Sequence, residues 1–150
     1  MSRTRILIAC SLAIAVPASL AAVSSAADTT LKAVSMTGSQ ESPKGDADGS
    51  GSATLTLKSS KVCYVIKVKK AGLTFLSGHI HPGAKGKSNP KPIIPLFQTP
   101  KKVKGGKLVG CSGKVKASDI AKVRAAPKNF YVNVHNAKYP AGALRGQLSK

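Results

Sequence analysis

The three histidines of the 150-residue chain are the residues best suited to hold a metal ion. His79 and His81 are separated by one residue in a segment typical of a β-strand, so both imidazoles should lie on one face. His135 lies in a second alternating segment, on the face that also carries Tyr131 and Asn133. Three imidazoles from two strands could bind Cu or Zn. The other interpretation is that the histidines are partly buried, hydrogen-bonded residues that hold a loop in place.

Acidic residues are too few for most catalytic sites. The chain has five Asp and Glu residues, and none lies between Gly49 and Ser118. A Ser-His-Asp triad needs a buried Asp beside a His. The sequence DADG at residues 46–49 resembles the start of a calcium loop, but Leu57 stands where the EF-hand pattern needs a Glu. We therefore expect a binding protein without a catalytic role.

Lysines dominate the middle of the chain. Residues 49–118 contain 14 lysines, no arginine and no acid, and the whole chain has a net charge of +19. Half of these lysines fall in two predicted loops and form the candidate polyanion site: Lys85, Lys87, Lys91, Lys101, Lys102, Lys104 and Lys107. Such a surface would attract anionic cell-wall polymers, acidic polysaccharide or lipid headgroups. Stacking aromatics are few, so sequence-specific nucleic-acid binding is not expected. A merely solvated basic surface is the alternative.

The N-terminal segment has the features of a secretory signal peptide. Two arginines precede an uncharged apolar run over residues 6–23, and small residues follow at 24–27. Residues 1–27 are therefore interpreted as a signal peptide, whose removal leaves 123 residues with a net charge of +17. An uncleaved membrane anchor and a lipoprotein signal at Cys10 are the alternatives. We expect a secreted protein, extracellular or in the cell envelope, with no transmembrane helix in the mature chain.

Cys63 and Cys111 are the two cysteines of the predicted mature chain. An even pair in an exported protein favours one disulfide. The bond would close a loop of 47 intervening residues, which is worth about 4 kcal/mol in the chain-entropy description. Zinc binding by both thiolates is the alternative, although cysteines that bind zinc are usually two to four residues apart.

Alternation of apolar and polar residues predicts a series of short strands. The clearest are Ser52–Lys58 and Val62–Lys69, each with one apolar face. The others are predicted at Leu31–Thr37, Leu73–His81, Ile93–Gln98, Leu108–Lys116, Phe130–Asn136 and Ala143–Leu148. Pro95 suggests an edge strand, and Ser118 is expected to cap a helical segment of one or two turns. Seven or eight such strands predict one all-β domain, an antiparallel sandwich or barrel.

Three strings resemble the CHRD (chordin-type) domain family. Gly78–Ala84 resembles the family segment HIHGPA, and Phe130–Leu148 resembles its long C-terminal motif. Gly38–Pro43 is similar to its opening, GxQExP. The strings occur in family order and indicate a CHRD domain at residues 31–149. The resemblance implies an immunoglobulin-like or superoxide-dismutase-like Greek-key β-sandwich, with no settled activity.

The chain departs from the family pattern at informative positions. Pro82-Gly83 reverses the usual order, and Ala143 replaces a common Glu, so Arg145 loses a possible carboxylate partner. The dismutase holds copper and zinc with more histidines and an aspartate, so three histidines exclude a two-metal site. A non-catalytic, secreted binding module is therefore the expected function. A copper- or zinc-binding protein with weak dismutase-like redox activity is the alternative.

Overall fold

The computed structural model describes residues 27–150, so all but the last residue of the predicted signal peptide lie outside the described residues. The described strands are β1 (Thr29–Thr37), β2 (Ser50–Leu57), β3 (Val62–Lys69), β4 (Thr74–Phe75), β5 (Ser77–Pro82), β6 (Ile94–Phe97), β7 (Lys101–Lys102), β8 (Lys107–Cys111), β9 (Phe130–His135) and β10 (Leu144–Gln147). The helical segments are η1 (Gly38–Gln40), α1 (Ala117–Ala125) and η2 (Pro127–Asn129). No helix in this range is long and apolar enough to cross a membrane.

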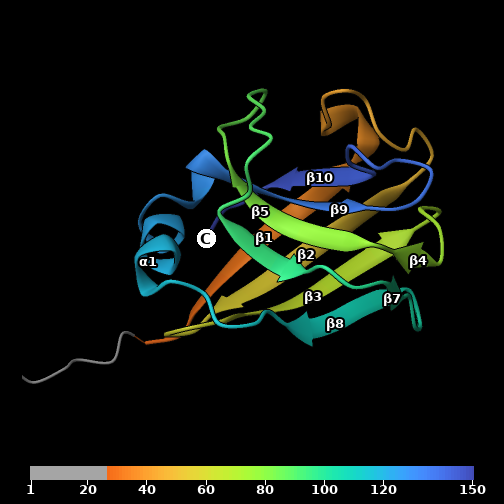
Figure 1. The fold of residues 1–150 in the computed structure, drawn as a ribbon. Helices are drawn as coiled ribbons and strands as arrows, with labels where there is room; N and C mark the ends of the chain where they lie inside the picture. The colour runs from red at the N-terminus through yellow and green to blue at the C-terminus, as the bar shows by residue number, and fades with distance from the viewer. Residues whose placement is uncertain (1–26) are drawn as a thin grey trace, which may run out of the picture.

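Eight of the strands form one antiparallel sheet in the order β6-β5-β9-β10-β1-β2-β3-β8, and β4 pairs with β7 separately (Figure 1). The predicted all-β antiparallel fold is confirmed. The apolar side chains of the β5-β9-β10 part and of the β1-β2-β3 part belong to one core. The sheet therefore curls into a nearly closed barrel, with its two parts facing each other across this core.

The core is built by the alternation seen in the sequence. In β2, Leu55 and Leu57 are fully buried, whereas Thr54, which lies between the core residues Ala53 and Leu55, is exposed. In β3, Tyr64 and Ile66 are buried on the same side. Strands β2 and β3 pair residue by residue along their whole length, so these apolar faces form one continuous surface.

Strands β5, β9 and β10 are buried on both faces, and this arrangement creates the candidate site. Ile80, Val132 and Leu144 point into the barrel core. The alternate residues of these strands are polar and point outward. Three loops, at residues 38–49, 83–92 and 136–143, fold over that outer face, and for this reason His81, Asn133 and Arg145 are buried although they point outward.

Some sequence expectations about local structure are wrong. The strand predicted at Leu73–His81 is divided into β4 and β5, and the predicted basic loop after Thr99 contains β7. Strand β8 ends at Cys111, short of the predicted end at Lys116. Ser118 does not cap α1, because the helix starts one residue earlier and the backbone carbonyl of Lys116 accepts its first hydrogen bonds. The expectation from Pro95 is confirmed, since β6 lies at the sheet edge.

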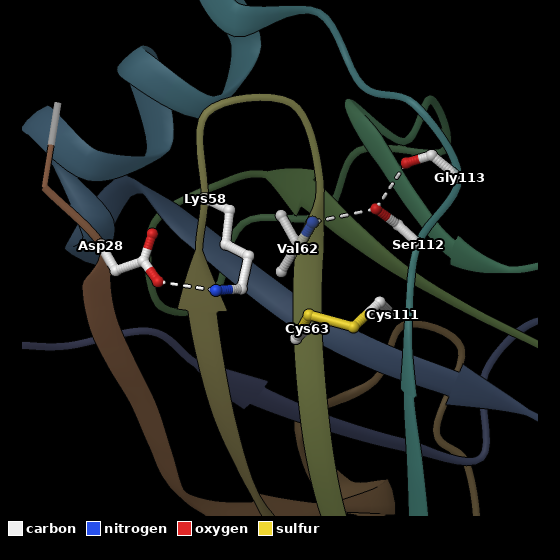
Figure 2. The surroundings of a disulfide bond; sticks show 7 residues. All are labelled: Asp28, Lys58, Val62, Cys63, Cys111, Ser112 and Gly113. Carbon is white, nitrogen blue, oxygen red and sulfur yellow. Dashed lines mark hydrogen bonds and ion pairs between the residues drawn. A yellow bond between two sulfur atoms is a disulfide. The ribbon is translucent and has the colours of Figure 1, made fainter. Parts of the chain in front are cut away.

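Cys63 and Cys111 form the expected disulfide (Figure 2). The two cysteines lie directly opposite each other in the paired strands β3 and β8. Next to the bond, the Val62 N–H donates to Ser112 Oγ at 2.9 Å, and that hydroxyl donates to the carbonyl of Gly113 at 2.8 Å. The disulfide thus fastens the edge strand β8 to the sheet, and both sulfurs are used by it rather than by zinc.

Candidate metal centre

The pairing of β5 with β9 brings the three histidines together. In this register Ser77 lies opposite His135, and His79 lies opposite Asn133. His79, His81 and His135 therefore project from the same outer face of two neighbouring strands. One ring nitrogen from each lies within 4.8 Å of the corresponding nitrogens of the other two. The structure thus groups the histidines that the sequence singled out.

Backbone carbonyls hold two of the histidines in a defined tautomer. His81 Nδ1 lies 2.8 Å from the carbonyl oxygen of Asn89, and His135 Nδ1 lies 3.0 Å from that of Pro140. A carbonyl oxygen only accepts hydrogen bonds, so both Nδ1 atoms must carry the proton. In a neutral imidazole this leaves the Nε2 lone pair free, which is the usual state of a histidine that binds a metal.

The third histidine, His79, points its Nδ1 atom at the free Nε2 atom of His135. His79 Nδ1 lies 3.2 Å from His135 Nε2. Because His135 Nε2 carries no proton, His79 Nδ1 donates this hydrogen bond in the metal-free chain. Two ligands at the usual Zn–N distance in a tetrahedral site are about 3.3 Å apart. The spacing of this pair therefore already suits a shared metal ion, which would replace the hydrogen between the two nitrogens.

Burial favours the neutral form of all three imidazoles. Burial lowers the pKa of His79 to about 4, and the neighbouring His135 and His81 add to the shift. Burial also lowers the pKa of His81 and of His135, against the opposing effect of their hydrogen bonds to backbone carbonyls. The neutral form is the one that binds metal ions.

Tyr131 fixes the orientation of His81 by stacking against its ring. The two rings are stacked, with centroids 5.0 Å apart and an angle of 5° between their planes. The Arg145 guanidinium carbon lies 3.4 Å from the centroid of the tyrosine ring, a close cation–π contact. The Tyr131 hydroxyl donates to the Asn89 carbonyl at 3.0 Å, the same oxygen that His81 uses. Tyr131 therefore holds both the His81 ring and the loop that carries Asn89 in position.

A cavity of about 450 Å³ lies beside the cluster, with His81 and His135 in its lining. Its lining also includes Glu41 and Asn133, and these two residues and His81 are each at most 6% exposed. Three buried atoms of these residues have no hydrogen-bond partner: Glu41 Oε1, His81 Nε2 and Asn133 Oδ1. Unpartnered buried polar atoms are rare in folded proteins. All three atoms belong to residues that line the cavity, so buried polar groups lie directly behind its wall.

Glu41 is the site residue that the sequence analysis missed. Burial raises its pKa to about 7, although the Asn133 side chain and the Arg145 charge oppose the shift. Gly142 leaves room for the carboxyl group, because a Cβ atom at this position would collide with the carboxyl. Gly142 also has a φ of +145°, which residues with side chains rarely adopt. Arg145 acts on Glu41 through its charge alone, and its guanidinium donates to the backbone carbonyls of Ala84 and Lys87. The only signal for Glu41 in the sequence is the GSQESP string, which resembles the opening motif of the family but does not show where the side chain lies.

The seven candidate polyanion lysines do not all line one hollow. Four of them line a single hollow of about 400 Å³ together with Leu108 and Val109; they are Lys101, Lys102, Lys104 and Lys107. Lys85 lines a different hollow, with Glu41 and Arg145 in its wall. Lys87 and Lys91 are exposed in the loop that follows β5 and line neither hollow.

Comparison with protein families matches residues 32–148 to the CHRD domain. The match covers most of the chain, and the chain therefore belongs to the CHRD domain family. This confirms the resemblance inferred from the three strings. Comparison with curated proteins and with solved structures found no match.

Proposed function

We propose that this CHRD domain is a non-catalytic module that binds one Cu(II) or Zn(II) ion through His79, His81 and His135. The observation that carries the proposal is the convergence of three neutral imidazoles, all within 4.8 Å of one another at their ligand nitrogens. Two of them are held in the metal-binding tautomer by backbone carbonyls. Imidazole suits both metals, and Cu(II) forms the tighter complexes at a given nitrogen site.

A purely structural role of the histidines makes a different prediction. The hydrogen bonds to Asn89 and Pro140 also fasten two loops to the sheet. This role alone gives no reason for the ligand nitrogens of all three rings to lie within 4.8 Å of one another. If the histidines only hold loops, replacing them should alter stability without altering metal retention.

The test is metal retention by the untagged chain lacking residues 1–27. One equivalent of Cu(II) is added, the protein is dialysed, and retained copper and its EPR spectrum are measured. We expect stoichiometric retention with a nitrogen-rich spectrum, lost in His81→Ala and in His135→Ala. Ser77→Ala is the matched control, since Ser77 is opposite His135 in the same register but offers no imidazole, and it should retain copper.

Two results would contradict a metal site. One is retention by the unchanged protein below about a tenth of an equivalent, since a stable site should survive dialysis. The other is retention that persists when all three histidines are replaced. Circular dichroism of each metal-free variant shows whether it is folded, so that loss of copper is not mistaken for loss of structure.

We propose that the protein acts outside the cytoplasm, either secreted or in the cell envelope. Support comes from the Cys63–Cys111 disulfide, because such bonds persist in oxidising compartments. The signal-peptide features of residues 1–27 point the same way. Expression of the full chain followed by fractionation should place it outside the cytoplasm, with residues 1–27 removed.

Binding of an acidic polysaccharide is a second candidate function. It is favoured by the hollow of about 400 Å³ in which four lysines meet. Replacing Lys101, Lys102 and Lys104 by Gln should weaken retention on immobilised alginate, a polyuronate. Replacing the exposed Lys44, Lys114 and Lys128 by Gln removes the same charge elsewhere and is the control. Equal losses in both triple variants would show that net charge alone is responsible.

A further inference from the structure

We propose that the cavity beside the histidine cluster binds a small hydroxylated carboxylate, such as a sugar acid, whose carboxylate completes the coordination of the metal. This inference rests on the proposed metal site and adds its ligand. It is carried by the incomplete donor set of the cluster, the position and size of the cavity, and the polar atoms on its wall.

The protein supplies too few ligands to saturate the metal. Among residues 27–150, the cluster contains three histidines, and no carboxylate or thiolate joins it. Zinc sites with three protein ligands leave a fourth position for water or for a bound molecule. A metal ion held here would likewise have an open position for a ligand from outside the chain.

The cavity gives such a ligand access to the metal. Two of the three metal-binding residues, His81 and His135, are part of its lining. Its volume of about 450 Å³ is far more than one water molecule needs, which is about 30 Å³. It is within the range of pockets that bind small molecules. A ligand of several heavy atoms can therefore contact the metal at one end and the cavity wall at the other.

The wall of the cavity is polar beyond the histidines too. Glu41 and Asn133 bring a carboxyl group and an amide to the lining. Ser42 and Ser88 add hydroxyl groups to the lining. Hydroxyls of a ligand can exchange hydrogen bonds with these two serine hydroxyls. An apolar ligand would displace water from the serine hydroxyls without replacing its hydrogen bonds, at a cost in binding.

The charge of the surroundings favours an anion. The chain has a net charge of +19, and the Arg145 guanidinium is close enough to Glu41 to lower its pKa. A divalent metal bound by three neutral imidazoles adds two positive charges. A carboxylate on the metal is attracted by this field. Hydroxyls at one end and a carboxylate at the other together define a hydroxylated carboxylate.

The experiment uses the Cu(II)-loaded chain lacking residues 1–27, with copper stoichiometry measured first. Azide, D-glucuronate and D-glucose are then titrated, and the EPR and optical spectra of the copper are followed. Azide reports an open coordination position, and glucuronate has the proposed chemistry. Glucose has the hydroxyls without the carboxylate. We expect saturable spectral changes with azide and with glucuronate, and none with glucose.

Two substitutions in one loop separate the cavity from the metal. Ala141→Trp places a large side chain on the cavity lining, whereas Ala137→Trp makes the same exchange at an exposed position outside it. We expect Ala141→Trp to retain one copper and to lose at least about tenfold in glucuronate affinity. Its azide affinity should stay within about twofold of the unchanged protein. Ala137→Trp should behave as the unchanged protein does.

The outcomes distinguish this inference from the proposed function. If copper is not retained, the metal site itself is wrong. If copper is retained but azide causes no change, the metal has no open position and the inference is overturned. It is also overturned if glucuronate does not bind, or if it binds equally well to Ala141→Trp. Binding of glucose as strongly as glucuronate would show that the carboxylate does not reach the metal.

Discussion

Glu41 is a carboxyl group that folding buries, at 6% exposure. Its pKa is raised from 4.5 to about 7, with burial as the largest cause. Between these two values the unfolded chain ionises Glu41 while the folded chain keeps it protonated. The folded state therefore loses stability as the pH rises through this window, and the contribution is full only below about pH 4.5.

Glu41→Gln should remove this pH dependence. With Gln in place, the free energy of unfolding relative to the unchanged protein should rise between pH 4.5 and pH 7, by up to about 3 kcal/mol. The measurement is urea denaturation of both metal-free proteins across this range. The histidines, whose pKa values are lowered, make the folded state less stable as the pH falls below 6.5. Their effect is the same in both proteins and cancels in the difference.

Asp48→Asn is the control for the Glu41 prediction. Asp48 is an exposed acid of the same loop, so its replacement removes one acid from the loop without removing a buried carboxyl group. A flat difference curve for Glu41→Gln would show that Glu41 ionises in the folded protein as it does in the unfolded chain.

At the scale of the elements, β2 is a strand with one face in the core and the other toward solvent. Leu55 is fully buried between Leu31 of β1 and Tyr64 of β3. Leu55→Ala should lower the free energy of unfolding by about 3 kcal/mol, because it removes buried methyl groups and leaves a cavity. Thr54→Ala on the exposed face should change it by less than about 0.5 kcal/mol. Urea denaturation measures both, and equal losses would contradict the assignment of the two faces.

Local alternation predicted the strands with one apolar and one polar face, such as β3, whose bounds are those expected from the sequence. It could not predict β4 and β7, which are two residues long and exist through their pairing with each other. The same distinction holds for the site. Period two in β5 predicted that His79 and His81 share a face, but the approach of Glu41 depends on loops folding over the sheet. Such contacts between distant segments leave no periodic signal in the sequence.

At the scale of the whole molecule, the disulfide links residues that are 48 positions apart in the chain. It encloses β4, β5, β6 and β7 in one covalent loop. The bond stabilises the folded state mainly by restricting the unfolded chain. In the chain-entropy description, a loop of this length contributes about 4 kcal/mol to the free energy of unfolding.

Replacing both Cys63 and Cys111 by Ser should therefore lower the free energy of unfolding by about 4 kcal/mol. Urea denaturation of the double variant and of the oxidised protein measures the difference. Mass spectrometry of the exported protein without reductant should find no free thiol. Two cysteines that react with an alkylating agent would show that the bond does not form in the exported protein.

The two-sided burial of β5, β9 and β10 has a consequence for how this protein can change. The inward residues of these strands hold the barrel together, whereas their outward residues meet one another and the three covering loops. Loops accept substitutions and insertions more readily than strands do. New loop sequences could thus give descendants of this protein a different ligand preference while the barrel interior stays as it is. Evolution can change the outward face of these strands without disturbing their inward face.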